Sequence, residues 1–466
     1  MGSEFYGLEI AKKTLQAQQL AMNISGHNIA NSNTVGYTRQ VPKFTQQTST
    51  PVGLFTLPYI KNISSGVVLE EVQRIRDRYL DLQIRQESRR GAYWESMSKG
   101  LEQIELIFGE PGESGLSGVF DSFWNSWQEL AANPESSAAR VLVSETADRL
   151  AHAFNDTYRR LVTQQDQLNE EIAIKVAEVN NYLQQIYDIN HQIARLGAGG
   201  GNINDYRDQL DVLVDKLSQI LSVQIKDNDN GTYTLVLQGQ ILVNSETKNG
   251  LSLDVDSVTG LNRVTLGVSG EELNLTYQDG ELRALFDLRD ERVEEYKGYL
   301  DRLAGDLITA VNALHQTGYT LENPPKKGGA FFVGSGASDI AVNPDILVDA
   351  NKIATSSTGA AGDGSIALAI AELRGERIVD SASATPDDYY RGFISRLGTQ
   401  RGEVIRLASN QKFLVEELEA RKESVSGVSL DEEMTNLIKY QHTYEAASFL
   451  VNTIDGMLET LISWMR

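Results

Sequence analysis

The sequence has no cysteine among its 466 residues. Disulfides, thiolate nucleophiles and cysteine-ligated metal sites are therefore excluded together. No run approaches the ~18 apolar residues of a membrane span, and no basic start followed by an apolar segment marks a secretory signal. Residues 1–5 resemble a cloning scar and carry no weight in the fold prediction. A membrane is accordingly not among the expected partners.

Basic residues are scarce relative to acidic ones. The chain has 42 Lys and Arg against 64 Asp and Glu, a formal net charge of −22. Nucleic acid is therefore not an expected partner, because phosphate binding needs basic patches. Between Lys13 and Arg39 there is no formally charged side chain at all. A solvated helix normally carries charge on its outer face, so this stretch is predicted to be buried in an assembly.

Catalytic and metal-binding patterns are also missing. The five histidines are scattered, with no H-E-x-x-H, and there is no G-x-S-x-G. The glycines of 197–201 lack the Gly-Lys-Ser/Thr ending of a phosphate loop, and residues 227–238 lack the ligands of a calcium loop. Asn230-Gly231 predicts a type I′ hairpin instead. We expect no enzyme activity, no cofactor and no metal.

What the sequence does contain is a seven-residue apolar spacing at both ends. The stripes are Leu8, Leu15, Met22 and Ile29 at the start, and Leu430, Leu437, Tyr444, Val451 and Leu458 at the end. This spacing is typical of helices that pack along a seam. The companion positions are small or polar: Ala11, Gln18, Ser25, Gln441, Ser448 and Asp455. A half-polar seam holds an isolated pair weakly, so many copies are expected to bury it.

The rest of the chain predicts a mainly α protein with a β-rich insertion. At ~150 residues per domain, about three domains are expected. Long periodic helices are predicted at 76–108, 137–196, 204–221, 281–316 and 387–425. Pro42, Pro51 and Pro58 forbid a long helix within residues 40–70. The predicted parts are paired terminal helices (1–40 plus 427–466, disordered in the free monomer), a long-helix bundle body (41–222, 280–316 and 366–426), a β-hairpin-rich insertion (223–279) and an irregular excursion (317–365). This nested order predicts an elongated molecule whose termini meet at one end.

The most informative motif is the signature segment, residues 23–39. Asn28 and Asn31 stand near the predicted helix end, where Asn can adopt left-handed angles, and Gly36 is free to take angles that other residues resist. Tyr37 offers an apolar ring with a polar tip, and Arg39 a rigid donor fork. The plain alternative is an Asn-rich helix end with no further role.

The signature segment resembles the N-terminal element of the bacterial flagellar rod, hook and hook-associated proteins, an axial protein family. Asn28-Ile29-Ala30-Asn31, Thr34, Gly36 and Tyr37 all match it. Residues 427–447 and 454–462 resemble the other end of that family. The interior stretches 74–77, 123–127 and 131–140 are similar to the family member that joins the hook to the filament.

The resemblance implies a structural subunit of the hook–filament junction, exported through the flagellar type III apparatus to an extracellular position. The implied partners are further copies in a ring-like assembly, the hook protein, hook-associated protein 3 and an export chaperone. The implied assembly interface comprises Leu8, Leu15, Met22, Asn28, Ile29, Asn31, Gly36, Tyr37, Leu430, Leu437, Gln441, Tyr444, Val451 and Leu458. The alternatives are another axial protein (hook, rod or hook-associated protein 3), a soluble enzyme with a helical body, and a coiled-coil chaperone or signalling protein.

Overall fold

The computed structural model describes residues 2–46, 66–109, 115–199, 201–267 and 269–464. Helices dominate, as the sequence predicts: α1 (Gly2–Ala30), α2 (Arg78–Phe108), α3 (Leu116–Ala132), α4 (Ser137–Ala198), α5 (Asn204–Ile220), α6 (Glu281–Phe286), α7 (Val293–His315), α8 (Pro344–Val348), α9 (Ser365–Glu372), α10 (Pro386–Ser426) and α11 (Leu430–Trp464). A π-helical stretch, η2 (Asp287–Arg292), joins α6 to α7, and short 3-10 turns lie at η1 (Leu275–Tyr277) and η3 (Ala350–Lys352). Every long body helix begins and ends within about two residues of its predicted bounds.

The strands are short and form small separate sheets. They are β1 (Gln40–Gln46), β2 (Val67–Arg74), β3 (Gln224–Asp227), β4 (Tyr233–Leu237), β5 (Gln240–Val243), β6 (Leu251–Val255), β7 (Asn262–Leu266), β8 (Phe332–Val333) and β9 (Ala341–Val342). All pairings are antiparallel, in the orders β1-β2, β3-β4-β5, β6-β7 and β8-β9. Pro42 lies in β1, while Pro51 and Pro58 lie outside the described residues.

The chain folds into two compact units. The first comprises Met1–Ser88, Val179–Gly250 and Lys412–Arg466, and the second comprises Arg89–Glu178 and Leu251–Gln411. The long helices α2, α4 and α10 each begin in one unit and end in the other. The predicted four-part division of the chain stays a prediction.

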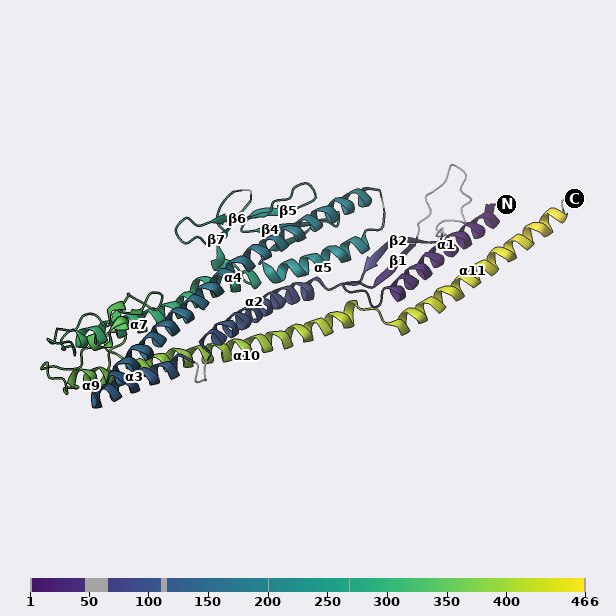
Figure 1. Ribbon diagram of the computed structural model, residues 1–466. Helices are drawn as coiled ribbons and strands as arrows, with labels where there is room; N and C mark the ends of the chain where they lie inside the picture. The colour runs from purple at the N-terminus through teal and green to yellow at the C-terminus, as the bar shows by residue number, and fades with distance from the viewer. Residues whose placement is uncertain (1, 47–65, 110–114, 200, 268, 465–466) are drawn as a thin grey trace. The chain divides into compact units, whose positions relative to one another are not determined.

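The first unit contains both ends of the chain. α1 and α11 lie side by side, which confirms the predicted pairing of the terminal helices (Figure 1). The β1–β2 ribbon, paired from Gln40 opposite Arg74 to Gln46 opposite Val67, packs against α1. Helix α5 contacts β2, and the β3-β4-β5 sheet follows α5 in the chain. The signature segment therefore leads from the terminal helix directly into the folded part of this unit.

The hairpin predicted at Asn230-Gly231 is present, but the prediction of a type I′ turn was wrong. A longer loop joins β3 to β4, and Asn230 is not among the described non-glycine residues with positive φ. Its side-chain oxygen accepts hydrogen bonds from the backbone N–H and the hydroxyl of Thr232, which fixes the loop as an Asx turn. Positive φ at both central positions occurs at Gln238 and Gly239, between β4 and β5.

The second unit has an aromatic core. Phe123, Trp124 and Trp127 of α3 are fully buried. Trp127 packs against Phe331, with ring centroids 5.1 Å apart, and Phe123 packs against Phe332 at 5.9 Å. Aromatic rings bury large areas and prefer such tilted arrangements. The aromatic side chains of α3 therefore form much of the core of this unit.

Candidate assembly interface

The buried face of α1 is made of small residues. Ala11, Ala21, Ser25 and Asn28 are each at most 2% exposed, whereas the predicted stripe of Leu8, Leu15, Met22 and Ile29 is only half-buried. A Cβ on Gly7 would lie 3.1 Å from Ile454 Cδ1. Small side chains let two helices approach closely. The most buried positions of α1 are therefore small or polar residues, among them Ala11 and Ser25 of the companion row, and not the leucine stripe.

The seam of α11 contains the predicted stripe together with an unpredicted partner row. Leu437, Tyr444, Val451 and Leu458 are half-buried, while Leu430 is 51% exposed. The companion row runs through Glu433, Tyr440, Ala447 and Ile454, of which all but Tyr440 are buried. Gln441 and Asp455 are exposed. Ser448 of the same predicted row is half-buried. Spacings of three and of four residues both fit a heptad, so within this chain the row of Glu433 is the more buried one, and the role of the Gln441 row between copies stays a prediction.

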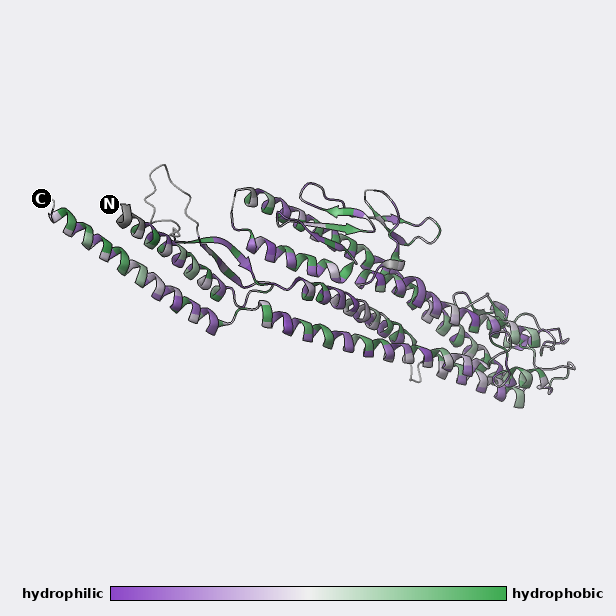
Figure 2. Cartoon of the chain, turned by 180° about the vertical axis from the view of Figure 1, so that it is seen from behind, coloured by the Kyte–Doolittle hydropathy of each residue, from purple (hydrophilic) through white to green (hydrophobic). Residues whose placement is uncertain are grey.

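Much of the apolar surface of α11 has no cover in this chain. Phe449 is 74% exposed and Trp464 85%, and Figure 2 shows that hydrophobic residues recur along the length of this helix. The further exposed apolar residues are Leu430, Met434, Ile438, Leu450, Met457, Leu461 and Ile462. A groove of about 390 Å³ is lined by Leu8, Lys12, Leu15, Gln16 and Gln19 of α1 and by Val451 of α11. Large apolar side chains exposed in such number on one helix indicate an interaction site.

Asn28 connects the end of α1 to the start of β1. Its side-chain Nδ2 donates to the carbonyl oxygen of Gln40 (2.8 Å), and its Oδ1 accepts from the Gln40 backbone N–H (3.0 Å). The residue is 1% exposed. The side-chain amide of Asn28 thus provides hydrogen-bond partners for both the backbone N–H and the backbone carbonyl of Gln40, as a neighbouring strand would. Asn31 instead donates to the His27 carbonyl at the helix end (3.0 Å) and accepts from the hydroxyl of Thr34 (3.2 Å).

Tyr37 and Gly36 fold the signature segment back onto α1 and α5. The Tyr37 hydroxyl donates to Asn28 Oδ1 (2.7 Å) and lies 3.0 Å from His27 Nδ1. Burial raises the pKa of Tyr37, and the nearby carboxylates of Asp205, Asp208 and Glu433 add to that rise. Gly36 has φ +79°, and a Cβ there would lie 2.1 Å from Val212 Cγ2. The motif therefore needs glycine both for its backbone angle and for its close approach to α5.

Arg39 joins the signature segment to the start of α11. Its Nε donates to Glu433 (2.7 Å) and its Nη1 to Glu432 (2.6 Å). Burial alone would lower the pKa of Arg39, but the hydrogen bonds to these two carboxylates raise it. The backbone N–H of Arg39 donates to the Ser426 carbonyl (3.1 Å), and its carbonyl accepts from Ile75 N–H (2.9 Å). Three segments far apart in sequence therefore meet at this residue.

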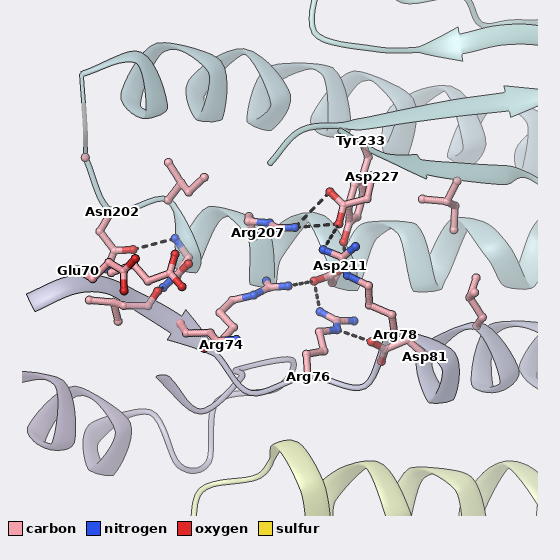
Figure 3. A pocket seen from close by; sticks show the side chains of 18 of the residues that line it. Glu70, Arg74, Arg76, Arg78, Asp81, Asn202, Arg207, Asp211, Asp227 and Tyr233 are labelled. Carbon is pink, nitrogen blue, oxygen red and sulfur yellow. Dashed lines mark hydrogen bonds and ion pairs between the residues drawn. The ribbon is translucent and has the colours of Figure 1, made fainter. Parts of the chain in front are cut away.

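A buried cluster of arginines and aspartates lies next to the signature segment. It borders a cavity of about 790 Å³ between β2, the start of α2 and α5 (Figure 3). Asp211 accepts from Arg74 (2.8 Å), from Arg85 (3.2 Å), from Arg76 and from the Tyr233 hydroxyl (2.6 Å). With four donors on one carboxylate, the cluster fixes α5 against β2 and α2.

Asp208 and Asp81 complete the cluster with opposite pKa shifts. Asp208 accepts from Arg74 (2.8 Å) and from the Thr38 backbone N–H (3.1 Å); burial raises its pKa in spite of these partners. Burial also acts to raise the pKa of Asp81, but the hydrogen bond from Arg76 and the charge of Lys422 bring it below the usual value. The Thr38 contact links the cluster to the signature segment.

Reasoning from the sequence missed this cluster and Glu433. Two signals were available: aspartates at positions 205, 208, 211 and 215 recur every three or four residues, and arginines at 74, 76 and 78 alternate. The first spacing places carboxylates on one face of a helix and the second places guanidinium groups on one face of an extended segment. Runs of charge usually indicate solvated faces, and only the packing of α5 against β2 and α2 reverses that expectation.

Two further searches concern the described part of the chain. None of its helices combines the length and the apolar character that crossing a membrane requires. In the same residues, no three or more His, Asp or Glu side chains gather in a group that could hold a metal ion.

Three family patterns match the chain. Residues 101–332 match the flagellar hook-associated protein FlgK helical domain. Residues 8–38 match the flagella basal body rod protein family, and residues 423–463 match the C-terminal region of the flagellar basal body rod FlgEFG proteins. The two rod-type matches fall on α1 with the signature segment and on α11.

Curated relatives match over the whole length. Flagellar hook-associated protein 1 of Bacillus subtilis (strain 168) is 32% identical over 515 residues, which cover 100% of this chain and 99% of the relative. The protein of the same name from Escherichia coli (strain K12) is 27% identical, covering 97% of this chain and 98% of the relative. The solved structure of the flagellar hook junction protein FlgK from Burkholderia pseudomallei has a TM-score of 0.67 at 15% identity, covering 74% of this chain and 100% of that one. At this identity the structural match supports the fold alone.

Proposed function

The chain belongs to the flagellar hook-associated protein 1 family, and we propose that it forms the structural junction between hook and filament by packing its terminal helices against those of neighbouring copies. The observation that carries the mode of assembly is the uncovered apolar surface of α11 beside the half-buried stripe of α1. An isolated chain leaves this surface in water, whereas packed copies would remove it. The chain is a flagellar structural protein, part of a structure outside the cell.

The finer partners follow from the family. We propose a ring-like assembly of this chain, the hook protein on one side, hook-associated protein 3 on the filament side, and an export chaperone before passage through the flagellar type III apparatus. The rod-type matches at residues 8–38 and 423–463 support a shared mode of axial packing. Nucleic acid and membrane are not among the proposed partners, and no catalytic step is proposed. Family membership decides against the alternatives of a hook, rod or hook-associated protein 3 identity.

The residues expected at the assembly interface from the sequence fall into two groups, the seams of the terminal helices and the signature segment. Leu8, Leu15, Met22, Ile29, Leu437, Tyr444, Val451 and Leu458 are half-buried, Leu430 is exposed beside them, and Gln441 lies on the exposed side. Asn28, Gly36 and Tyr37 act instead within one chain, because their contacts hold α1 to β1 and α5. Asn31 also acts within one chain, through its contacts with His27 and Thr34 at the end of α1. We therefore propose that the signature segment positions the helices and that the stripes make the contacts between copies.

The test is assembly in a strain that lacks the native gene. Phe449→Asp puts a carboxylate on the exposed face of α11, where a neighbouring copy would bury it at a cost of several kcal/mol per contact. The variant should be exported but should leave cells without filaments beyond the hook. Phe449→Leu, which keeps an apolar side chain, is the matched control and should restore swimming. Normal filaments with Phe449→Asp would contradict packing through this face.

A further inference from the structure

An unusual helical turn joins α6 to α7 in the second unit. Across η2 (Asp287–Arg292) the backbone forms a π-helix, and the N–H of Val293 donates to the carbonyl of Leu288, five residues earlier. A π turn holds one residue more than the α turn it replaces. Such turns are rare, and they lie disproportionately at functional sites. Residues 284–289 are all buried, so the turn is surrounded by the rest of the unit.

Arg289 is the side chain that connects this turn to the β6–β7 hairpin. The side chain is 4% exposed, and its Nη1 donates to the carbonyl of Asn262 in β7 (2.8 Å) and to Asn169 Oδ1 in α4 (2.8 Å). Asn169 Oδ1 also accepts from the Asn262 N–H (2.8 Å). The guanidinium group lies 4.7 Å from the centre of the Phe286 ring and donates to the neighbouring Asp290. The hairpin, α4 and η2 therefore meet at one buried guanidinium group.

Gln165 of α4 holds the backbone of the same turn. Its Nε2 donates to the carbonyl of Arg289 (3.2 Å) and to Glu294 (2.8 Å), and its Oε1 accepts from Lys297 (3.2 Å). The residue is 7% exposed. A shift of one residue along a helix turns a side chain by about 100°. The contacts of Arg289 and Gln165 are therefore specific to the observed register.

The other side of η2 packs on α2. Leu288 lies so close to Gly100 that a Cβ on this glycine would overlap the leucine side chain. Asp287 accepts from the hydroxyl of Tyr93 in α2 (2.9 Å) and from Arg283 Nε (2.9 Å). Helix α2 continues from here into the first unit. The turn thus contacts the hairpin through one residue and α2 through the two residues before it.

We propose that η2 is a two-state turn and that docking of the β6–β7 hairpin on α4 selects its register. With the hairpin docked, the bond from Arg289 to β7 exists only in the π register and stabilises it. With the hairpin displaced, Arg289 loses this acceptor, and residues 287–292 change to the α register with its ordinary i to i−4 hydrogen bonds. A contact shifts such an equilibrium only by the difference it makes between the two states, and this bond is present in one state alone.

The extra residue passes toward the start of α6. Helix α6 has 6 residues and α7 has 23, so α6 is the part that turns. Gly280, which precedes α6 with φ +99°, is free to adopt the angles that the altered entry requires. Leu288 then leaves its place on Gly100, and displacement of the hairpin reaches α2. This inference goes beyond the proposed function, because it concerns communication inside the second unit and not assembly.

Hydrogen exchange on the full-length protein tests the coupling from both sides. Leu251→Ala removes a buried side chain from β6, the strand that does not carry Asn262, and loosens the hairpin. Exchange should rise by more than about tenfold in peptides covering 252–266 and also in those covering 286–293, because opening of the hairpin releases the π register. Arg289→Gln should raise exchange in the same two segments.

Arg292→Gln is the matched control for the loss of a charge. Arg292 lies in the same turn, is half-buried and pairs with Glu295 at 3.1 Å. Its replacement should leave exchange in the hairpin and in the turn unchanged. Peptides covering 116–132 should not change in any of the three variants.

Single-residue deletions test the register itself. Deletion of Glu291, an exposed residue of η2, should give one continuous α-helix from α6 to α7, because the π turn holds one residue too many for it. Both helices then keep their buried faces, and the variant should retain a cooperative urea transition. Deletion of Gly298, which is exposed in α7 with open space around it, should abolish that transition, because it turns one part of the buried face by about 100°.

The deletion also removes the coupling. In the chain without Glu291, Leu251→Ala should still raise exchange in 252–266 but no longer in 286–293, because the α register is already present. Two results would overturn the proposal: a hairpin opened by Leu251→Ala with no change in 286–293 of the full chain, or equal damage from the deletions of Glu291 and Gly298. Both leave the proposed hook–filament role standing, since neither experiment measures assembly.

Discussion

The side-chain amide of Asn28 forms two hydrogen bonds with the backbone of Gln40, in the way that the backbone of an adjacent strand would. Asn28 Nδ2 donates to the Gln40 carbonyl (2.8 Å), and the Gln40 N–H donates to Asn28 Oδ1 (3.0 Å), which also accepts from the Tyr37 hydroxyl. One buried amide therefore ends the terminal helix, starts β1 and holds the intervening loop. This explains in physical terms why an asparagine stands at this position of the signature segment.

Replacing Asn28 by aspartate should loosen this junction. An aspartate keeps the acceptor for Gln40 N–H but places a second oxygen against the Gln40 carbonyl, which loses its donor. We expect the free energy of local opening at Gln40 to fall by about 2–3 kcal/mol, measured by amide exchange. Asn23→Asp, at an exposed position of the same helix, should change it by no more than about 0.5 kcal/mol. Equal effects of the two variants would contradict the assigned role of Asn28.

Gly36 should tolerate alanine only when Val212 is shortened. Gly36→Ala introduces a Cβ 2.1 Å from Val212 Cγ2 at a φ of +79°, so steric overlap adds to a left-handed backbone penalty of about 1–2 kcal/mol. Val212→Ala removes the overlapping methyl group. The double variant should recover part of the stability lost in Gly36→Ala, as judged from urea unfolding by circular dichroism. A purely additive double variant would show that the contact with α5 does not matter.

Asp211 should matter more than its neighbour Asp215. Asp211→Asn removes the buried negative charge that pairs with Arg74, Arg76 and Arg85. Breaking a buried ion pair in this way lowers the free energy of unfolding by about 3–5 kcal/mol. Asp215 is 33% exposed and pairs with Arg85 at 2.5 Å and Lys422 at 3.8 Å, so Asp215→Asn should cost only about 1 kcal/mol. The midpoints of urea unfolding give both values. Similar midpoints for the two variants would mean that the cluster does not brace the first unit.

His315 should make the second unit sensitive to mild acid. Its ring lies 2.8 Å from the Gly329 carbonyl through Nδ1 and accepts from Ala354 N–H through Nε2 (2.9 Å), which requires the neutral form. Burial lowers the pKa of His315 from 6.5 to about 4. The unfolded chain therefore binds more protons between these values, so this contribution to stability is complete above pH 6.5 and is lost as the pH falls toward 4. The total loss is about 3 kcal/mol.

Urea unfolding followed by tryptophan fluorescence, to which Trp124 and Trp127 in the core of the second unit contribute, measures this dependence at pH 7 and at pH 4.5. His152, an exposed histidine in the same unit, provides the control: His152→Gln should retain the loss. His315→Gln should show a smaller pH dependence, whatever its absolute stability. An unchanged pH dependence in His315→Gln would rule out the histidine as its source.

The sequence predicted well wherever periodicity determines the outcome. The long helices follow from apolar residues at three- and four-residue spacing. The pairing of the two ends followed from matching heptads, which need no knowledge of the remaining structure. Gly36 was recognised for its backbone freedom, and it has the positive φ that this freedom permits.

The remaining features depend on which helix and strand surfaces pack against each other in the folded chain. Tyr440 and Gln441 both fit a heptad beside Leu437, and only the position of α1 selects Tyr440. The aspartates of α5 have the pattern of a solvated helix face, and the arginines that bury them come from residues 74–85, more than 120 positions away. Asn230-Gly231 has the composition of a type I′ turn, but the side chain of Asn230 hydrogen-bonds to Thr232 and stabilises a different loop. Local sequence does not encode these choices.

The most direct measurement is electron cryo-microscopy of intact flagella from the bacterium that carries this chain, with parallel labelling by an antibody against it. The proposed function predicts label only where hook meets filament, and a layer of density there into which this fold fits, with α1 and α11 packed against the same helices of neighbouring copies. Label along the filament or the hook would contradict the junction role. A junction layer in which the apolar face of α11 remains uncovered would contradict assembly through the terminal helices.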